Sequence, residues 1–174
     1  MTRALRIILI AGLLMGGGNL AFAQDGAITG VRTLASMPVQ DCDGLALGDI
    51  DGDGAVDLLT SSGAEGEVFW FEQGAGPADW RRHSIHEGAT EIEGNDLADV
   101  DGDGQLEAFS LDQEEGTVLL HRPADTPRGS WETEVIRSGR PFLQASLPTD
   151  LDDDGRPEFV YTWEGTAPGA GGVH

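Results

Sequence analysis

A nine-residue acidic segment occurs three times along this chain at almost constant spacing. The copies begin at Asp49, Asp99 and Asp150, so the period is 50 and then 51 residues. A tryptophan keeps the same period, because Trp80 in the first unit aligns with Trp131 in the second. Separate features that share one long period indicate a repeat architecture, in which each unit is a small supersecondary structure.

Each unit reads as a sheet of four short strands. In the first unit we expect strands over 45–49, 56–61, 67–72 and 80–86, separated by turns that contain Gly or Pro. No stretch after the N-terminal leader shows a helical period. Four strands in about fifty residues are typical of a propeller blade. The sequence therefore predicts an all-β fold of β-propeller blades, each with four antiparallel strands.

The repeat units do not add up to a closed ring. We expect the units at 41–90, 91–141 and 142–174, and the third stops where its third strand should begin. The chain thus holds about two and a half to three blades, a partial propeller, whereas a ring needs at least about four. We expect the chain to be a fragment of a longer product. The alternative is that two or more copies assemble to close the ring.

The N-terminus reads as a cleaved signal peptide over residues 1–23. Two arginines precede an apolar stretch over 7–15, and residues 21–23 supply the small-x-small pattern that signal peptidase recognises. The apolar stretch is too short for a bilayer of roughly 30 Å, which argues against a membrane anchor. We therefore expect cleavage near Ala23/Gln24 and a secreted or periplasmic protein with no membrane span. Residues 24–40 would form a lead-in with a possible outer strand.

The charge of the chain excludes some partners. Its formal net charge is −21, which repels nucleic acid and anionic membranes, so we expect no nucleic-acid partner. Disorder is the alternative for an acidic, Gly-rich chain, but here the acids cluster at fixed spacing between apolar stretches. Cys42 is the only cysteine, so no intrachain disulfide can form. Because it aligns with Ile92 and Leu143, we expect it to be a small core residue.

The three acidic segments have the composition of calcium-binding loops. Each has carboxylates at positions 1, 3, 5 and 9, with glycines that let the backbone curl. Calcium takes six to eight oxygen ligands at roughly 2.3–2.6 Å in a flexible geometry. An EF-hand would need Glu at position 12, where this chain has Thr60, Ser110 and Tyr161. The alternative is that the segments are surface turns that bind no metal.

The acidic loop between two short strands, Asp-x-Asp-Gly-Asp-Gly-x-x-Asp, resembles the FG-GAP/VCBS repeat, which is related to the calcium-binding blades of integrin α-subunits. The resemblance extends over roughly residues 31–174. It implies a bladed propeller, often seven-fold, with calcium in the loop that joins the first two strands of a blade. The chain would then be part of such a seven-bladed ring.

The resemblance also implies a ligand set of four carboxylates and one backbone carbonyl in each loop. The ligands would be Asp49, Asp51, Asp53, the Ala55 carbonyl and Asp57; Asp99, Asp101, Asp103, the Gln105 carbonyl and Glu107; and Asp150, Asp152, Asp154, the Arg156 carbonyl and Glu158. The third loop departs most from the pattern, with Asp153 in place of a glycine and Pro157 after position 7. We therefore expect two to three Ca²⁺ ions.

The remaining residues show no catalytic constellation. None of the histidines recurs in the repeat or lies beside a nucleophile signature; they are His83, His86, His121 and His174. Trp80 and Trp131 hold the same position in their units, which favours a packing role for them over a role as a sugar-binding platform. We therefore expect a binding or adhesion module that recognises an extracellular protein or polysaccharide. We do not expect an enzyme. The alternatives are a structural spacer, or part of a carbohydrate-active, lyase- or dehydratase-like propeller enzyme whose site lies outside this chain.

Overall fold

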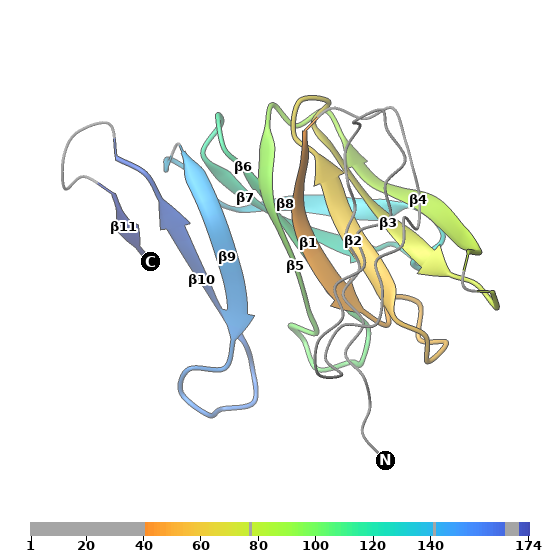
Figure 1. Cartoon of the computed structure of the whole chain (residues 1–174). Helices are drawn as coiled ribbons and strands as arrows, with labels where there is room; N and C mark the ends of the chain where they lie inside the picture. The colour runs from red at the N-terminus through yellow and green to blue at the C-terminus, as the bar shows by residue number, and fades with distance from the viewer. Residues whose placement is uncertain (1–40, 77, 141, 166–170) are drawn as a thin grey trace, which may run out of the picture. The chain divides into compact units, whose positions relative to one another are not determined.

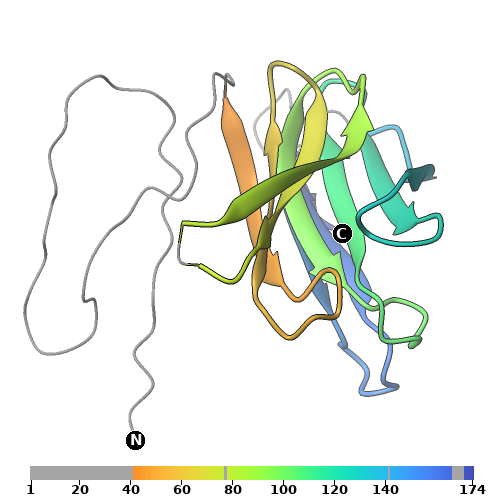
Figure 2. The ribbon, with the colours of Figure 1, turned by 90° about the vertical axis from the view of Figure 1, so that its right-hand side faces the viewer.

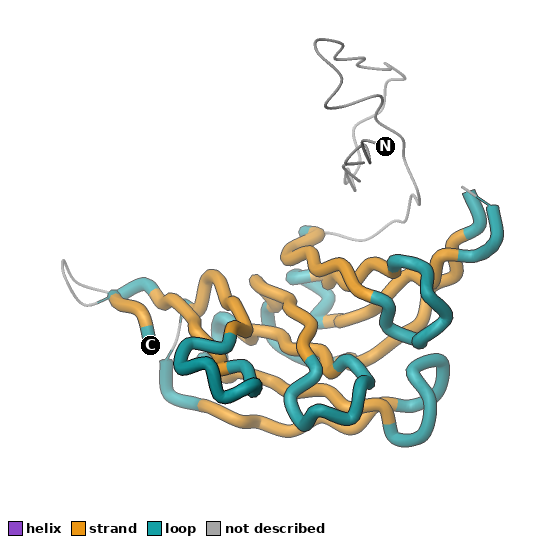
Figure 3. The backbone as a smooth tube through the Cα atoms, turned by 90° about the horizontal axis from the view of Figure 1, so that it is seen from below, coloured by secondary structure: helices purple, strands orange, loops and turns teal. Residues whose placement is uncertain are grey.

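The computed structural model describes residues 41–76, 78–140, 142–165 and 171–174. These residues form eleven β-strands joined by loops and no helix (Figure 3). Among them there is accordingly no helix long and apolar enough to cross a membrane. The all-β prediction is confirmed. The signal peptide predicted over 1–23 and the lead-in predicted over 24–40 lie outside the described residues.

The strands form three antiparallel sheets, one for each predicted unit (Figure 1). Blade 1 has the order β1-β2-β3-β4, blade 2 the order β5-β6-β7-β8, and blade 3 the order β11-β10-β9. The strands are β1 Cys42–Gly48, β2 Asp57–Ser62, β3 Glu67–Gln73 and β4 Trp80–Glu87; β5 Ile92–Ala98, β6 Glu107–Asp112, β7 Thr117–Pro123 and β8 Trp131–Arg137; and β9 Leu143–Thr149, β10 Glu158–Trp163 and β11 Gly172–Val173. The prediction of four-stranded antiparallel blades is therefore confirmed for the first two units.

Blade 3 has a short third strand at the place where the sequence predicts that strand to begin. The two-residue strand β11 pairs with β10, so that Thr162 lies opposite Val173 and Trp163 opposite Gly172. In the order of the sheet, β11 occupies the position that β3 and β7 have in the other blades. β11 is therefore the third strand of this blade.

Hydrophobic side chains fill the space between neighbouring blades. One cluster joins Leu59, Trp70 and Ile85 of blade 1 to Ile92 and Leu119 of blade 2, and all five are buried. A second cluster joins blade 2 to blade 3 in the same way. Burial of a side chain of this size contributes about 1.5–3 kcal/mol. Each sheet thus buries a face against the next blade instead of forming a core of its own.

The first strands of the blades approach one another closely, with β5 next to both β1 and β9 (Figures 1 and 2). A Cβ atom on Gly44 would lie 2.2 Å from Nδ2 of Asn95, so only glycine fits there. That Asn95 amide nitrogen donates to the Asp43 carbonyl at 2.9 Å and to Oγ of Ser61 at 2.7 Å. This contact holds β5 against β1 and against Ser61 of β2.

The prediction that Cys42 is a core residue is only partly correct. Ile92 and Leu143 lie at the equivalent positions and have no exposed area, because another blade packs against each of them. Cys42 itself is half-buried. It lies at the start of blade 1, and within the described part of the chain no blade precedes it. Burial raises the pKa of the Cys42 thiol, and the neighbouring carboxylates add to this shift.

Candidate metal centres

The three acidic segments lie at the same place in each blade, between its first and second strands. We call them loop 1 (49–57), loop 2 (99–107) and loop 3 (150–158). Each loop begins directly after β1, β5 or β9, and its ninth residue is the first residue of β2, β6 or β10. The strand–loop–strand placement predicted from the sequence is therefore confirmed for all three copies.

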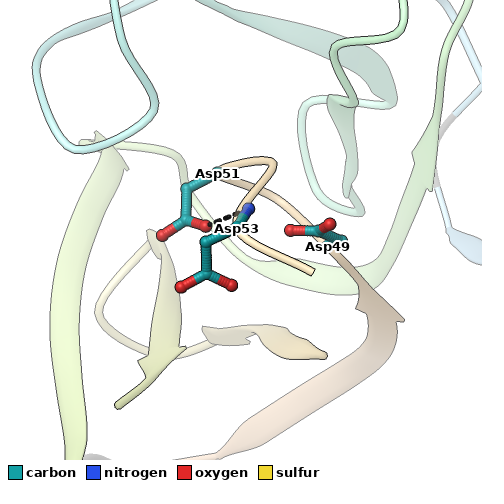
Figure 4. Close-up of side chains that lie close together, drawn as sticks. All are labelled: Asp49, Asp51 and Asp53. Carbon is teal, nitrogen blue, oxygen red and sulfur yellow. Dashed lines mark hydrogen bonds between the residues drawn. The ribbon is translucent and has the colours of Figure 1, made fainter. Parts of the chain in front are cut away.

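Each loop brings three carboxylates together. Figure 4 shows the group in loop 1, where Asp49, Asp51 and Asp53 lie close to one another. In each group, one oxygen from each residue lies within 4.8 Å of the others. The groups in the other loops are Asp99, Asp101 and Glu107, and Asp150, Asp152 and Glu158. Two oxygens on opposite sides of one calcium ion would be about 5 Å apart, so these spacings suit a shared ion.

Backbone N–H groups hold these carboxylates in place. In loop 1 the N–H of Gly54 donates to Asp49 at 2.9 Å, and that of Ala55 donates to Asp53 at 2.8 Å. The same pairs recur in loop 2 at 2.9 and 2.7 Å and in loop 3 at 2.9 and 2.8 Å. Gly54 has a φ of +89°, a conformation that an L side chain disfavours. The glycine at position 6 thus allows the turn that aims these donors inward.

Loop 3 keeps this shape despite its divergent sequence. Asp153 occupies the position of Gly52 and Gly102, and it adopts the same left-handed conformation with a φ of +60°. A non-glycine residue pays about 1–2 kcal/mol for that conformation. The substitution that makes loop 3 the least regular copy therefore strains the loop but keeps the two hydrogen bonds that all three loops share.

Position 9 differs between the loops in a way that the sequence does not reveal. Asp57 has no exposed area, and its two oxygens accept hydrogen bonds from the N–H groups of Ile50 and Gln73, both at 2.9 Å. Its carboxylate is not part of the loop 1 group. Burial raises the pKa of Asp57, although these two hydrogen bonds oppose the shift. In loop 1 the ninth residue therefore links the loop to the last residue of β3.

The longer side chain at position 9 of loops 2 and 3 reaches the carboxylate group. Oε2 of Glu107 accepts from Val100 N–H at 2.9 Å, and Oε2 of Glu158 accepts from Leu151 N–H at 2.8 Å. Both glutamates nevertheless belong to the groups of their loops. Burial raises the pKa of Glu107. One added methylene thus lets the residue fasten the loop and still reach the carboxylate group of that loop.

The remaining predicted ligands stay predictions. Asp103 and Asp154 accept backbone hydrogen bonds within their loops but are not members of the close groups. Nothing in the structure tests the carbonyls of Ala55, Gln105 and Arg156 as ligands.

A buried oxygen in loop 1 fits a bound cation. Oδ1 of Asp49 is buried, and no hydrogen-bond donor among the described residues reaches it. A carboxylate oxygen in this state is costly unless a positive charge compensates it. Every side-chain atom that the three groups offer to a metal ion is a carboxylate oxygen. Hard divalent cations such as Ca²⁺ prefer oxygen ligands of this kind. The residues present therefore fit a calcium ion.

The family model of the FG-GAP-like repeat matches residues 49–110 of this chain. The chain contains an FG-GAP-like repeat. The match starts at the first residue of loop 1 and includes loop 2, so the two most regular acidic loops lie inside the FG-GAP-like segment, and loop 3 lies outside it. The matched segment is shorter than the segment of residues 31–174 over which the sequence motifs suggest the resemblance. A search of curated proteins gave no match.

Two side chains of blade 2 contact loop 1, and no feature of the sequence predicts these contacts. Gln105 donates from Nε2 to the Ile50 carbonyl at 2.7 Å. Arg128, in the β7–β8 loop, pairs with Asp51 and, at 3.1 Å, with Glu72. These partners are 55 to 77 residues apart in the chain, so only the stacking of the blades brings them together.

The histidines are engaged in local contacts. His83 stacks on Trp70 at a ring separation of 4.5 Å, and its Nε2 lies 2.8 Å from Glu72. His121 has no exposed area and lies between the hydroxyls of Ser110 and Thr133, at 2.8 and 2.9 Å. These contacts account for both residues as parts of the blade interior.

Proposed function

We propose that this chain is a secreted, calcium-binding propeller-type module that recognises an extracellular protein or polysaccharide and is not an enzyme. The observation that carries the proposal is a group of three carboxylates that includes positions 1 and 3 of the loop and lies in the same strand–loop–strand setting in three successive blades. Unrelated surface turns would have no reason to repeat this geometry.

The bound ions would act as part of the folded structure. Two carboxylates about 4 Å apart repel by roughly 4 kcal/mol at an effective dielectric near 20, and a divalent cation removes this repulsion. A ligand at one hundred times its Kd stabilises the folded state by about 2.7 kcal/mol per site. The chain has no second cysteine to form a disulfide, so calcium is the available staple outside the cell.

Secretion is supported by the N-terminal sequence, in which an apolar stretch precedes the small-x-small pattern at residues 21–23. A non-catalytic role is supported by His121, both of whose ring nitrogens contact hydroxyls of the same blade, and by His83, whose Nε2 contacts Glu72. The recognition role rests on the exposed loops of a rigid repeat scaffold, which is where binding residues concentrate in such folds.

The proposal is tested by counting the calcium ions that each loop contributes. Equilibrium dialysis of the full chain should give two to three bound ions, and the substitutions D49N, D99N and D150N should each remove the ion of one loop. Asn keeps the size and one oxygen of Asp but removes the charge. E132A, on the exposed strand β8, is the matched control and should leave the stoichiometry unchanged. An unchanged ion count in all three loop variants would reject the metal assignment.

Recognition is tested separately. The calcium-loaded full chain is passed over immobilised acidic and neutral polysaccharides and over extracellular protein fractions, and the run is repeated with chelator. Binding that disappears with chelator would support a calcium-dependent recognition module. Binding to none of these surfaces, with calcium loading confirmed, would favour the structural-spacer alternative.

A further inference from the structure

A hydrogen-bonded path connects loop 1 to loop 2. At its centre is the peptide group of Ile50, a residue with no exposed area. The Ile50 N–H donates to Asp57 at 2.9 Å, and the Ile50 carbonyl accepts from Nε2 of Gln105 at 2.7 Å. The N–H of Gln105 in turn donates to Asp103 at 2.7 Å. The path therefore runs between carboxylates of two different acidic loops.

The Gln105 side chain is specific to this junction. Position 7 is Ala55 in loop 1, which has no side-chain donor, and Arg156 in loop 3. Among the described residues, no side-chain hydrogen bond from Arg156 reaches loop 2, whereas Gln105 reaches loop 1. The junction of loops 1 and 2 is thus built differently from the junction of loops 2 and 3.

The same residue belongs to both parts of the path. The backbone of Gln105 is fixed by the geometry of loop 2, because its N–H is held by Asp103. Its side chain donates to the carbonyl of the Ile50 residue, whose N–H donates to Asp57, the ninth residue of loop 1. Ordering loop 2 around an ion would therefore hold the Gln105 side chain in the position that loop 1 requires. A site whose neighbour is already ordered pays less conformational entropy on binding, which is the physical basis of positive coupling.

We propose that Gln105 couples the cation sites of loops 1 and 2, so that they bind calcium cooperatively while loop 3 binds independently. This inference rests on the proposed calcium-binding function. Gln105 acts here as a positioning residue through its side chain. Coupling of this kind is reciprocal, so calcium in loop 1 raises the affinity of loop 2 by the same factor.

The test uses a thermodynamic cycle in the full chain, measured by calorimetric calcium titration. All variants carry D150N, so that only loops 1 and 2 remain. Adding D99N then removes loop 2, and the affinity of loop 1 should fall by about 5-fold or more, the lower end of typical site–site coupling. Q105M keeps the backbone and side-chain length but has no N–H donor. In its presence D99N should change the loop 1 affinity by less than about 2-fold.

Controls keep the outcomes separate. Q113M makes the same substitution in the β6–β7 turn, away from the acidic loops, and should retain the coupling. Far-UV circular dichroism and the unfolding midpoint of each variant verify that it is folded, and Q105A replaces Q105M if the latter is not. If the calcium affinity of loop 1 is the same with and without D99N, the coupling is overturned, although calcium binding itself stands. Coupling that persists in Q105M would overturn the role of Gln105. A chain that binds no calcium would reject the proposed function itself.

Discussion

Arg128 of blade 2 is paired with Asp51 of loop 1 and covers its side chain, which has no exposed area. The guanidinium also contacts Glu72 on β3 at 3.1 Å, and this hydrogen bond raises the pKa of Arg128. In return, the hydrogen bond from Arg128 lowers the pKa of Glu72. One cation thus links two carboxylates of blade 1 to the neighbouring blade.

Removal of this cation should destabilise the chain in a salt-dependent way. In R128Q, Asp51 and Glu72 lose their shared partner, so the calcium-free variant should unfold at lower denaturant concentration than the wild type. The difference should shrink in about 1 M salt, where the Debye length is about 3 Å, compared with about 30 Å at 0.01 M. Urea unfolding in chelator at both salt concentrations measures the effect.

R122Q is the matched control, because Arg122 and Glu134 form a more exposed ion pair at 3.1 Å. Exposed pairs contribute little to stability. R122Q should therefore behave like the wild type at both salt concentrations. Equal destabilisation by R122Q and R128Q would show that the pair with Asp51 has no special role.

Asp57 should matter for folding even without calcium. D57A leaves the buried N–H of Ile50 and the partly buried N–H of Gln73 without their acceptor, and an unsatisfied buried group costs about 1–3 kcal/mol. We expect a loss of about 2–6 kcal/mol in the free energy of unfolding, measured by denaturant titration in chelator. E132A, on the exposed strand β8, should stay within about 0.5 kcal/mol of the wild type. A loss that appears only with calcium present would instead make Asp57 a metal ligand alone.

His121 should make the chain sensitive to mild acid. Burial, and then the nearby His86, lowers the pKa of His121 from 6.5 to about 3. Between these two values the unfolded chain binds a proton that the folded chain does not, so stability falls as the pH falls through this range. The slope attributable to His121 is about 1.4 kcal/mol per pH unit, or about 2 kcal/mol between pH 6.5 and 5.

H121F isolates this contribution, because blade 1 has Phe71 at the aligned position. The variant should be offset in stability by the lost hydrogen bonds to Ser110 and Thr133, but its stability should depend less on pH between 7 and 5. Guanidinium unfolding at a series of pH values gives both slopes. Parallel slopes for H121F and the wild type would contradict the account.

The sequence predicts the local structure well because local rules decide it. The β2 and β10 strands follow their acidic loops as expected, since Asp-Gly turns and β-branched or aromatic residues are short-range signals. The carboxylate groups of the loops were predictable for the same reason. Their members at positions 1 and 3 coincide with predicted ligands in every copy.

The contacts between blades were not predictable in this way. Arg128 contacts Asp51 across a sequence separation of 77 residues, and Gln105 contacts Ile50 across 55. At such separations the repeat predicts the sheets but not the contacts of individual side chains. The hydrogen bond that Asp57 accepts from Gln73 of another strand was likewise beyond the reach of local rules. The partial exposure of Cys42 could not be read from its alignment with Ile92 and Leu143, which are fully buried.

The central claim, that the acidic loops bind calcium, is tested most directly by native mass spectrometry of the full chain, first with calcium and then with chelator. The account predicts two to three calcium ions per chain at a folded charge distribution, all lost in chelator together with a lower thermal unfolding midpoint. A folded chain that retains no calcium, and whose unfolding midpoint is the same with and without chelator, would contradict it.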